Sequence, residues 1–576
     1  MKLQKLKILI LTIHIVAGSA LFAQTDFSPA KYVSADYSAY IETSSYSKLT
    51  EALKSFYIKL RGKTAEQEIQ ILATSMLQEF GINPLDMDSL SKIGFNTQAA
   101  IGFAAYTSIP LTPDEKTAPL SGDIVFIVPA TDSSLLITSL TDIIKKLEPE
   151  SIITETLPGK IWSVKGGDEI FIGKGENFVV FSNSNSRIQT TISPITNNLL
   201  SANEYMQMKK KTETFSKEQN RMIFYMFSPK DVANFSTSIM NEMMKIPGME
   251  NSANPAHNQL MTETNENLAS AGGTIDVSAL FTRLHIMYVY KDGYLQDKTK
   301  LIPSILIDDA KNLTVDQLNV APVFYFTFKM NIAKLVQLVT IMAPEFTESF
   351  AQGKQLFKLE TGLDLEEDLF AAFTGKFSMN LTGIPDEKNI SNLEAWPGFI
   401  SMGIDKNKRK VFETIFNMFK QKMATDKSKA INIKKFGQGT LYEFVNTKEV
   451  RKLDTKNSKK GKRVYKTEIK KDKLYILLAS DEITITSNEL NLKQLAKKDS
   501  KTVAQRFINL SAEEEKRSNA LVYINMTSLV KYVNSSSFKM LAAPFIGFFE
   551  NIEGVSMTSS THENTADSMI EIRLKK

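Results

Sequence analysis

One order of strand and helix patterns occurs twice along this chain, and this duplication limits the folds open to it more than any other feature. Residues 37–41 and 48–60 have the spacing of a strand followed by an amphipathic helix, and residues 323–328 and 332–342 repeat that spacing. The other matching pairs are 81–106 with 362–381, 124–147 with 399–423, 159–162 with 439–442, 169–182 with 473–487, 222–227 with 520–525, and 274–290 with 555–574. Seven pairs in one preserved order indicate a tandem duplication.

The connections between the predicted strands decide the fold class. Within each unit, strands often follow one another through short turns such as Asp292-Gly293. Strands joined in this way pair antiparallel, whereas doubly wound units need a regular alternation of strands and helices, which the chain lacks. The sequence therefore predicts an α+β fold of two repeated units, each a mainly antiparallel sheet covered by helices on one face.

The first residues have the pattern of a secretory signal peptide. Three lysines within the first seven residues precede the apolar run 8–16, and small residues follow at 18–23. This run is shorter than the roughly 20 residues that cross a bilayer, so we expect cleavage after Ala23 or Ala20 rather than a permanent anchor. The chain has no Cys, which excludes disulfides, a thiol nucleophile and a lipid-modified cysteine. We therefore expect a periplasmic or secreted protein without a transmembrane segment.

The duplication also sets the expected domain boundaries. After the signal peptide, residues 1–23, the first α+β unit is expected over residues 24–300. It contains a polar stretch without apolar period at about residues 240–273, which predicts a mobile loop. A connector at residues 301–320 then leads to the second unit, residues 321–576.

One local motif resembles a known group of proteins. The stretch Gly362-Leu363-Asp364 continues through Glu367-Asp368-Leu369 to Thr374-Gly375 and a predicted strand. In repeated strand and helix units behind a signal peptide, this stretch resembles exported bacterial proteins of unknown function built from tandem α+β units. The resemblance covers most of the mature chain. It implies the fold and the compartment, and it carries over no catalytic residue.

Few side chains of the sequence are suited to catalysis. The mature chain has three histidines, His257, His285 and His562, and none has a neighbour at the spacing of a metal site. Ser45 and Lys48 fit an SxxK pattern, but a cap ahead of the following helix explains this serine better. We therefore expect a binding protein rather than an enzyme.

Two other groups of residues have both a chemical and a structural interpretation. Carboxylates at residues 364–368 and 86–88 could serve hydrolysis or calcium binding, but acidic residues also cap helices and complement the helix dipole. Methionines between residues 240 and 261 surround His257 and could bind monovalent copper, but three of them have the spacing of a packed helix face. We predict the structural role in both cases, with no metal site and no cofactor.

The largest deviation in charge is a basic insertion in the second unit. Residues 448–473 hold twelve Lys or Arg and four acidic residues, which gives this segment a net charge of +8. The tip residues Lys459, Lys460, Lys462 and Arg463 are the predicted contacts with a partner. An anionic envelope surface or an acidic protein fits this charge, and nucleic acid does not fit the expected compartment. The alternative is a solvated tip of a protruding hairpin.

These features lead to a ranked set of functions. The preferred one is an exported binding or scaffolding protein of the cell envelope without catalytic activity. The alternatives are an envelope hydrolase that uses carboxylates from distant segments, and a carrier of an apolar ligand. Converging buried carboxylates with raised pKa values would favour the hydrolase, and a deep apolar cavity would favour the carrier.

Overall fold

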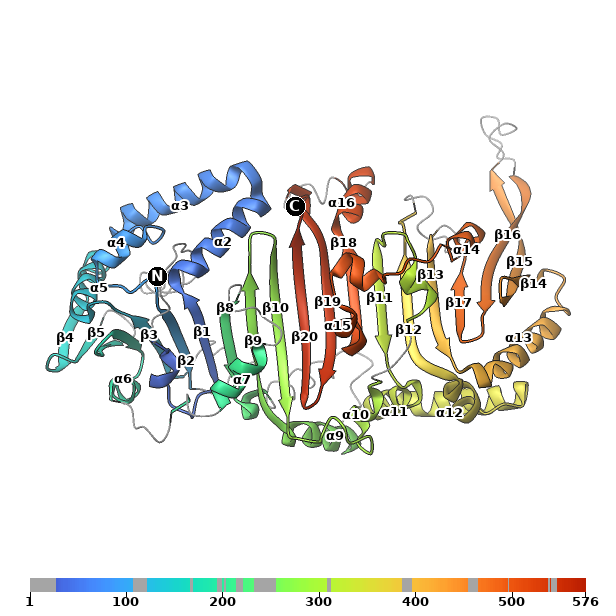
Figure 1. Ribbon diagram of the computed structural model, residues 1–576, viewed down its shortest axis with the longest axis horizontal. Coiled ribbons are helices and arrows are strands. Elements are labelled where there is room, and N and C mark those ends of the chain that lie inside the picture. The colour runs from blue at the N-terminus through green and yellow to red at the C-terminus, as the bar shows by residue number, and fades with distance from the viewer. Residues whose placement is uncertain are drawn as a thin grey trace.

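In the computed structural model, twenty strands form one continuous sheet (Figure 1). The structure describes residues 27–576 except 107–121, 166–168, 194–198, 201–203, 214–220, 233–254, 308–311, 386–395, 454–464, 496, 537–538, 540–545 and 548. Helices lie along the edges and over both faces of the sheet (Figure 1). The chain is therefore a mixed α and β protein with one large antiparallel sheet.

The described elements of the first half begin with a short 3-10 helix, η1 (Pro29–Tyr32). Its strands are β1 (Ala39–Ser45), β2 (Ala100–Ala105), β3 (Ile124–Pro129), β4 (Ile152–Leu157), β5 (Ile161–Lys165), β6 (Ile170–Lys174), β7 (Phe178–Ser182), β8 (Arg221–Phe227), β9 (Leu268–Val277) and β10 (Phe281–Tyr290). Its helices are α2 (Tyr46–Arg61), α3 (Ala65–Phe80), α4 (Met87–Lys92), α5 (Ser133–Leu147), α6 (Asn185–Ile192), α7 (Glu204–Thr212) and α9 (Pro255–Glu266).

The described elements of the second half follow two short segments, α10 (Leu301–Ile305) and η4 (Thr314–Gln317). Its strands are β11 (Phe324–Lys329), β12 (Phe373–Leu381), β13 (Gly398–Ile404), β14 (Lys429–Phe436), β15 (Gly439–Leu453), β16 (Tyr465–Leu478), β17 (Glu482–Thr486), β18 (Ser518–Asn525), β19 (Ile552–His562) and β20 (Thr565–Leu574). Its helices are α11 (Ile332–Met342), α12 (Pro344–Thr361), the π-helical turn η5 (Leu365–Leu369), α13 (Arg409–Met423), α14 (Glu489–Leu495), α15 (Ala512–Arg517) and α16 (Met526–Ser535).

The strand pairings follow the same scheme in both halves. The first half has the order β4-β5-β6-β7-β3-β2-β1-β8-β9-β10, and every pairing is antiparallel. The second half has the order β14-β15-β16-β17-β13-β12-β11-β18-β19-β20, again antiparallel throughout. Each pairing in the first half thus has a counterpart between strands whose numbers are higher by ten. Strands β10 and β20 pair along their lengths and join the halves.

Helices cover both faces of the sheet, so the prediction of one covered face per unit is wrong. On one face, α2 packs Leu49 and Leu53 against Ile275 of β9. On the opposite face, α7 buries Met208 in a core that includes Val125 of β3. The physical reason lies in strands such as β3, whose sequence is apolar at consecutive positions, so that both of its faces need cover.

The predicted polar loop over residues 240–273 is wrong for its second part. Residues 255–266 form α9, and residues 268–273 belong to β9. Residues 240–254 lie outside the described residues. Residues 274–277 of β9 fall within the predicted strands at 274–290, but residues 268–273 were missed because they have small side chains where an apolar alternation was sought. Gly272 and Gly273 lie against the backbones of β8 and β10.

Candidate functional site

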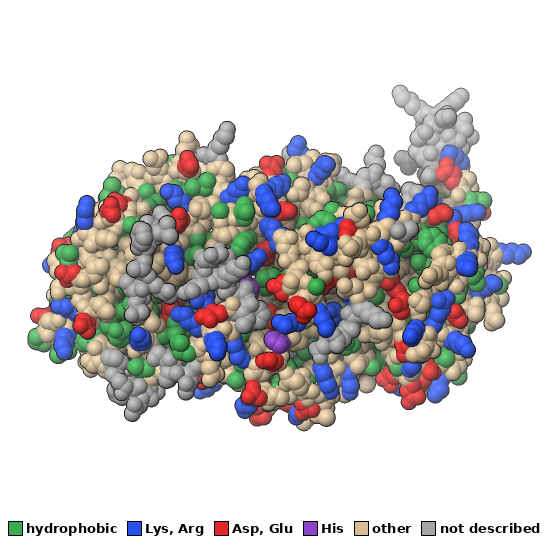
Figure 2. Space-filling view, in the orientation of Figure 1, with side chains coloured by type: hydrophobic (Ala, Val, Ile, Leu, Met, Phe, Trp, Pro, Cys, Tyr) green, Lys and Arg blue, Asp and Glu red, His purple; other side chains and the backbone are tan. Residues whose placement is uncertain are grey.

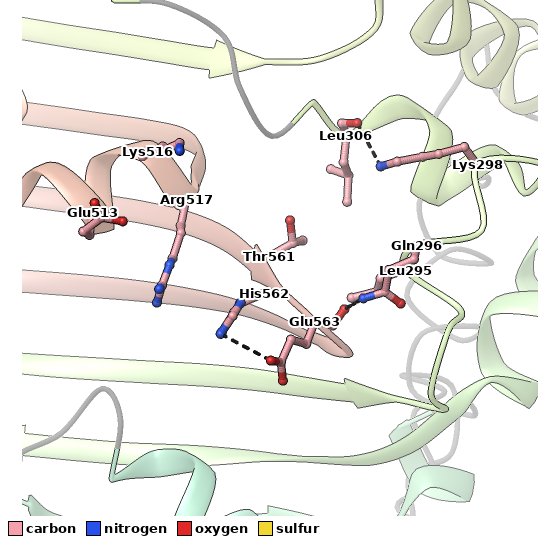
Figure 3. Close-up of a pocket in the computed structure, with 10 residues that line it drawn as sticks. All are labelled: Leu295, Gln296, Lys298, Leu306, Glu513, Lys516, Arg517, Thr561, His562 and Glu563. Atoms are coloured by element: carbon pink, nitrogen blue, oxygen red, sulfur yellow. Dashed lines mark hydrogen bonds and ion pairs between the residues drawn. The ribbon is translucent and has the colours of Figure 1, made fainter.

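A pocket of about 530 Å³ lies where the two halves meet (Figure 3). Four parts of the chain line it: the segment after β10 with Leu295, Gln296 and Lys298; Leu306 after α10; helix α15 with Glu513, Lys516 and Arg517; and the turn between β19 and β20. Within the turn, Glu563 has a positive φ of 50°, and its carbonyl oxygen accepts a hydrogen bond from Gln296 Nε2 at 2.5 Å. The pocket therefore depends on contacts between segments that are far apart in the sequence.

The side chains that line this pocket have mixed charges. Lys298 Nζ donates to the carbonyl oxygens of Pro303 at 2.9 Å and Leu306 at 3.3 Å, so its ammonium holds the backbone near α10. The Nε2 atom of His562 lies 4.0 Å from Glu563 Oε1 (Figure 3). The lining holds both basic and acidic groups, and its residues bring no nucleophile together with a base in hydrogen-bond contact. The pocket therefore presents polar groups of both charges.

The histidines lie in separate places. His285 is buried in β10, with Nε2 3.6 Å from the carboxylate of buried Asp276 in β9. Burial also raises the pKa of Asp567 in the adjacent strand β20. His257 belongs to α9, and its side chain lies outside the described residues. His285 is thus part of the interior of the sheet, while His562 lines the pocket.

The acidic cluster around Asp364 serves as a helix cap, which confirms the structural interpretation. Asp364 Oδ1 accepts hydrogen bonds from the backbone N–H groups of Glu366 at 2.9 Å and Glu367 at 3.1 Å, at the start of η5. These backbone hydrogen bonds lower the pKa of Asp364. Asp86 caps α4 in the same way through Asp88 N and Ser89 N. The carboxylates of Asp364 and Asp86 therefore accept hydrogen bonds from the backbone N–H groups at the start of the helical segments that follow them.

Ser45 also has a structural role in the described chain. Its hydroxyl oxygen accepts a hydrogen bond from the backbone N–H of Lys48 at 3.3 Å and caps α2. The hydrogen bond involves the backbone of Lys48, whereas an SxxK nucleophile needs the lysine side chain beside the serine. The prediction that this serine is a cap is confirmed.

The basic insertion extends the antiparallel pair β15 and β16 beyond the rest of the sheet (Figure 1). The pairing is described up to Leu453 and Tyr465, and the predicted contacts Lys459, Lys460, Lys462 and Arg463 lie outside the described residues. Figure 2 shows Lys and Arg side chains together with acidic ones over this end of the molecule. We call the pair β15 and β16 with its tip the basic hairpin.

Acidic residues compensate part of the charge at the base of the basic hairpin. Lys448 and Lys470 both contact Asp472, and their ammonium groups lower its pKa. Glu443 is buried and accepts hydrogen bonds from Lys473 at 2.6 Å and Lys434 at 3.2 Å. With Lys473 as the largest contribution, these contacts lower the pKa of Glu443 to about 2. These two carboxylates therefore compensate part of the charge of the four lysines around them.

Two helices that the sequence analysis missed lie at the edges of the sheet. They are α3 and α12, which have mostly exposed side chains and hence no clear apolar stripe. Their ends do leave a signal: Gly81 and Gly362 have positive φ angles of 77° and 72° and end the helices, and Pro344 begins α12.

Comparisons with known proteins identify a family for most of the chain. A family model described as "Protein of unknown function (DUF3352)" matches residues 107–575. No curated protein sequence matches the chain. Among solved structures, the one titled "Structure of crystal form I of TP0453" is similar at 10% identity, with a TM-score of 0.24, over 46% of this chain and 80% of that chain.

Among the described residues, no group of three or more His, Asp or Glu side chains could hold a metal ion. No helix in the described part of the chain combines the length and the apolar character needed to cross a membrane.

Proposed function

The chain belongs to the DUF3352 family, whose function is not known, and we propose that it is an exported, non-catalytic binding or scaffolding protein of the cell envelope. The observation that carries the proposal is the single sheet of twenty strands, from which the basic hairpin projects. Of the groups considered for catalysis, Ser45 and Asp364 cap helices and His285 lies in a buried pair, while His562 lines the pocket. A rigid platform with a charged projection is suited to holding a partner.

The proposal includes two tandem units, residues 24–300 and 321–576, joined by a connector at residues 301–320. The matching antiparallel pairings in the two halves support it, because unrelated folds would not share a complete pairing scheme. Export rests on the signal-peptide pattern of residues 1–23, and the absence of Cys agrees with a fold that is held by its core.

The proposed partner is an anionic surface of the envelope, contacted by the tip of the basic hairpin. The tip carries Lys459, Lys460, Lys462 and Arg463. Residues 454–464 carry five basic residues and one acidic residue, which is half of the net charge of the insertion within eleven residues. Exposed charges attract an anionic surface at low salt and are screened beyond about 10 Å at 0.1 M salt.

We expect a variant with Lys459→Glu, Lys460→Glu, Lys462→Glu and Arg463→Glu to lose binding to anionic envelope fragments at low salt. Its melting temperature should stay within about 2 °C of the wild type, because substitutions on an exposed surface have small effects. The matched control carries Lys145→Glu, Lys146→Glu, Lys160→Glu and Lys165→Glu, which changes the net charge equally at exposed positions of the first half. Equal losses in both variants would mean that only net charge matters and that the hairpin is not the contact.

A carrier of an apolar ligand is a second candidate, because one observation favours it. Two groups of directly paired apolar residues lie partly buried on the face that α2 covers: Ile41 with Phe103 in the first half, and Phe326, Met379 and Ile400 in the second. Partly exposed aromatic and aliphatic side chains on neighbouring strands offer a surface for a hydrocarbon chain.

If the protein is a carrier, it should bind a fluorescent fatty acid with saturation at one or a few molecules per chain. A Phe326→Gln variant should then bind it several-fold more weakly, because the polar side chain removes apolar contact area. The measurement is fluorescence titration, with Leu135→Gln on exposed α5 as the control. Binding that does not saturate, or that is equal in the two variants, would contradict the carrier.

A further inference from the structure

Two counterpart helices, α3 and α12, expose large apolar side chains. Ile71 and Leu77 of α3 are 67% and 50% exposed, and Leu356 and Leu359 of α12 are 59% and 82% exposed. Each helix follows the first strand and first helix of its half, so the two occupy corresponding places in the pairing scheme. Single exposed leucines are ordinary, but several on one peripheral helix form a surface that water solvates poorly.

The exposed side chains of α12 belong to a larger surface at the outer end of the second half. Glu360, next to Leu359, pairs with Lys422 of α13 at 2.6 Å. One turn before Lys422, Phe419 is 43% exposed, and Ile433 of the edge strand β14 is 41% exposed. Helices α12 and α13 and strand β14 lie at the same end of the molecule (Figure 1). We call Leu356, Leu359, Phe419 and Ile433 the outer apolar residues.

The two ends of the molecule differ in charge. In the second half, α12, α13, β14, β15 and β16 contain sixteen basic and eight acidic residues. Their counterparts in the first half, α3, α5, β4, β5 and β6, contain four basic and five acidic residues. Both ends expose apolar side chains, but only the second offers them among an excess of lysines. Because opposite charges attract, we expect an anionic partner at the outer end of the second half and not at that of the first half.

Resting on the proposed contact with an anionic surface, we propose that this surface is an anionic lipid bilayer, into which the outer apolar residues insert. Apolar side chains enter the boundary between headgroups and acyl chains, while neighbouring lysines contact the anionic headgroups. An anionic glycan or an acidic polymer would match the charge but would offer Leu356 and Leu359 no apolar surface. A second copy of this end would repel the first through its like charge.

The test compares two variants of equal design on vesicles of equimolar phosphatidylglycerol and phosphatidylcholine. The double variant Leu356→Gln with Leu359→Gln on α12 should bind vesicles about tenfold more weakly, because two leucine side chains are no longer transferred from water into the bilayer. Ile71→Gln with Leu77→Gln on α3 should bind like the wild type. Glutamine is a good helix former, and all four positions are exposed, so both variants should keep the wild-type melting temperature.

A spectroscopic readout tests insertion directly. In Leu359→Trp, the added tryptophan emission should shift to the blue when anionic vesicles are added, since the indole enters a less polar environment. In Leu77→Trp, no shift is expected. A shift of equal size in both, or in neither, would overturn the proposal.

The outcomes separate this inference from the proposed function. If the α12 variant binds vesicles as tightly as the wild type, insertion is overturned, while the anionic contact still stands if the hairpin variant loses binding. If the wild type binds immobilised polyglutamate but no vesicles, the partner is an acidic polymer and the inference is wrong. If the wild type binds neither at low salt, the proposed function fails as well.

Discussion

Replacing Lys376 by Met is expected to lower the free energy of unfolding by about 3–5 kcal/mol, the usual cost of leaving a buried charge without its partner. Lys376 in β12 is 2% exposed, and its Nζ lies 2.5 Å from Oδ2 of Asp316, which is fully buried. Asp316 also accepts hydrogen bonds from the hydroxyl of Tyr325 at 2.9 Å and from Leu313 N at 3.1 Å. This network fixes the segment that connects the halves to the sheet.

The pH dependence of the variant follows from the pKa of Asp316. Burial by itself raises that pKa, but the ammonium of Lys376 and the hydrogen bonds to the carboxylate lower it below its ordinary value. A depressed pKa stabilises the folded wild type above the unfolded pKa of about 3.9, and this contribution is lost as pH falls through the lower folded pKa. In Lys376→Met, Asp316 has no cation to lower its pKa, so it takes up a proton at a higher pH than in the wild type. The deficit of the variant should therefore shrink as the pH falls from 7 toward about 4, because the variant then takes up this proton in the folded state.

The measurement is urea unfolding of both proteins at pH 7 and near pH 4. The double variant Asp316→Asn with Lys376→Met is the control, because it removes both charges and should recover most of the lost stability. A loss below about 1 kcal/mol in Lys376→Met would show that the pair is accessible to water.

Replacing Gly273 by Ala is the second change with a large expected effect, a loss of about 3 kcal/mol or failure to fold. A Cβ at this position of β9 would lie 1.9 Å from the carbonyl oxygen of His285 and 2.6 Å from the hydroxyl of Tyr225. The nearest atom belongs to the backbone of β10, which pairs with β9 on one side and β20 on the other. The strand cannot move without disturbing the pairing that joins the halves.

Gly353→Ala is the matched control for this prediction. Gly353 lies inside α12 with no atom within 4 Å of an added Cβ, so alanine should stabilise the helix by up to about 1 kcal/mol. The two variants should therefore shift the midpoint of urea unfolding in opposite directions. A Gly273→Ala protein with an unchanged midpoint would mean that β9 is farther from β10 than described here.

The local elements could be predicted from the sequence, because their signals lie within a few residues. The strand and helix at residues 323–342 were predicted and correspond to β11 and α11. The caps at Ser45 and Asp364 were also predicted, since a cap depends only on neighbouring N–H groups. Helices α3 and α12 were missed because their exposed faces leave no periodic pattern.

Only the tertiary structure decided how these elements meet. Tyr40 pairs with Met226 across 185 intervening residues, and no local pattern encodes that register. The ion pair between Asp316 and Lys376 and the pocket at the β19–β20 turn likewise join distant segments. By itself, the sequence determined the order of the elements and the charge of residues 448–473, because both depend on neighbouring residues. The structure decided which strands pair, because register and approach follow from packing over the whole sheet.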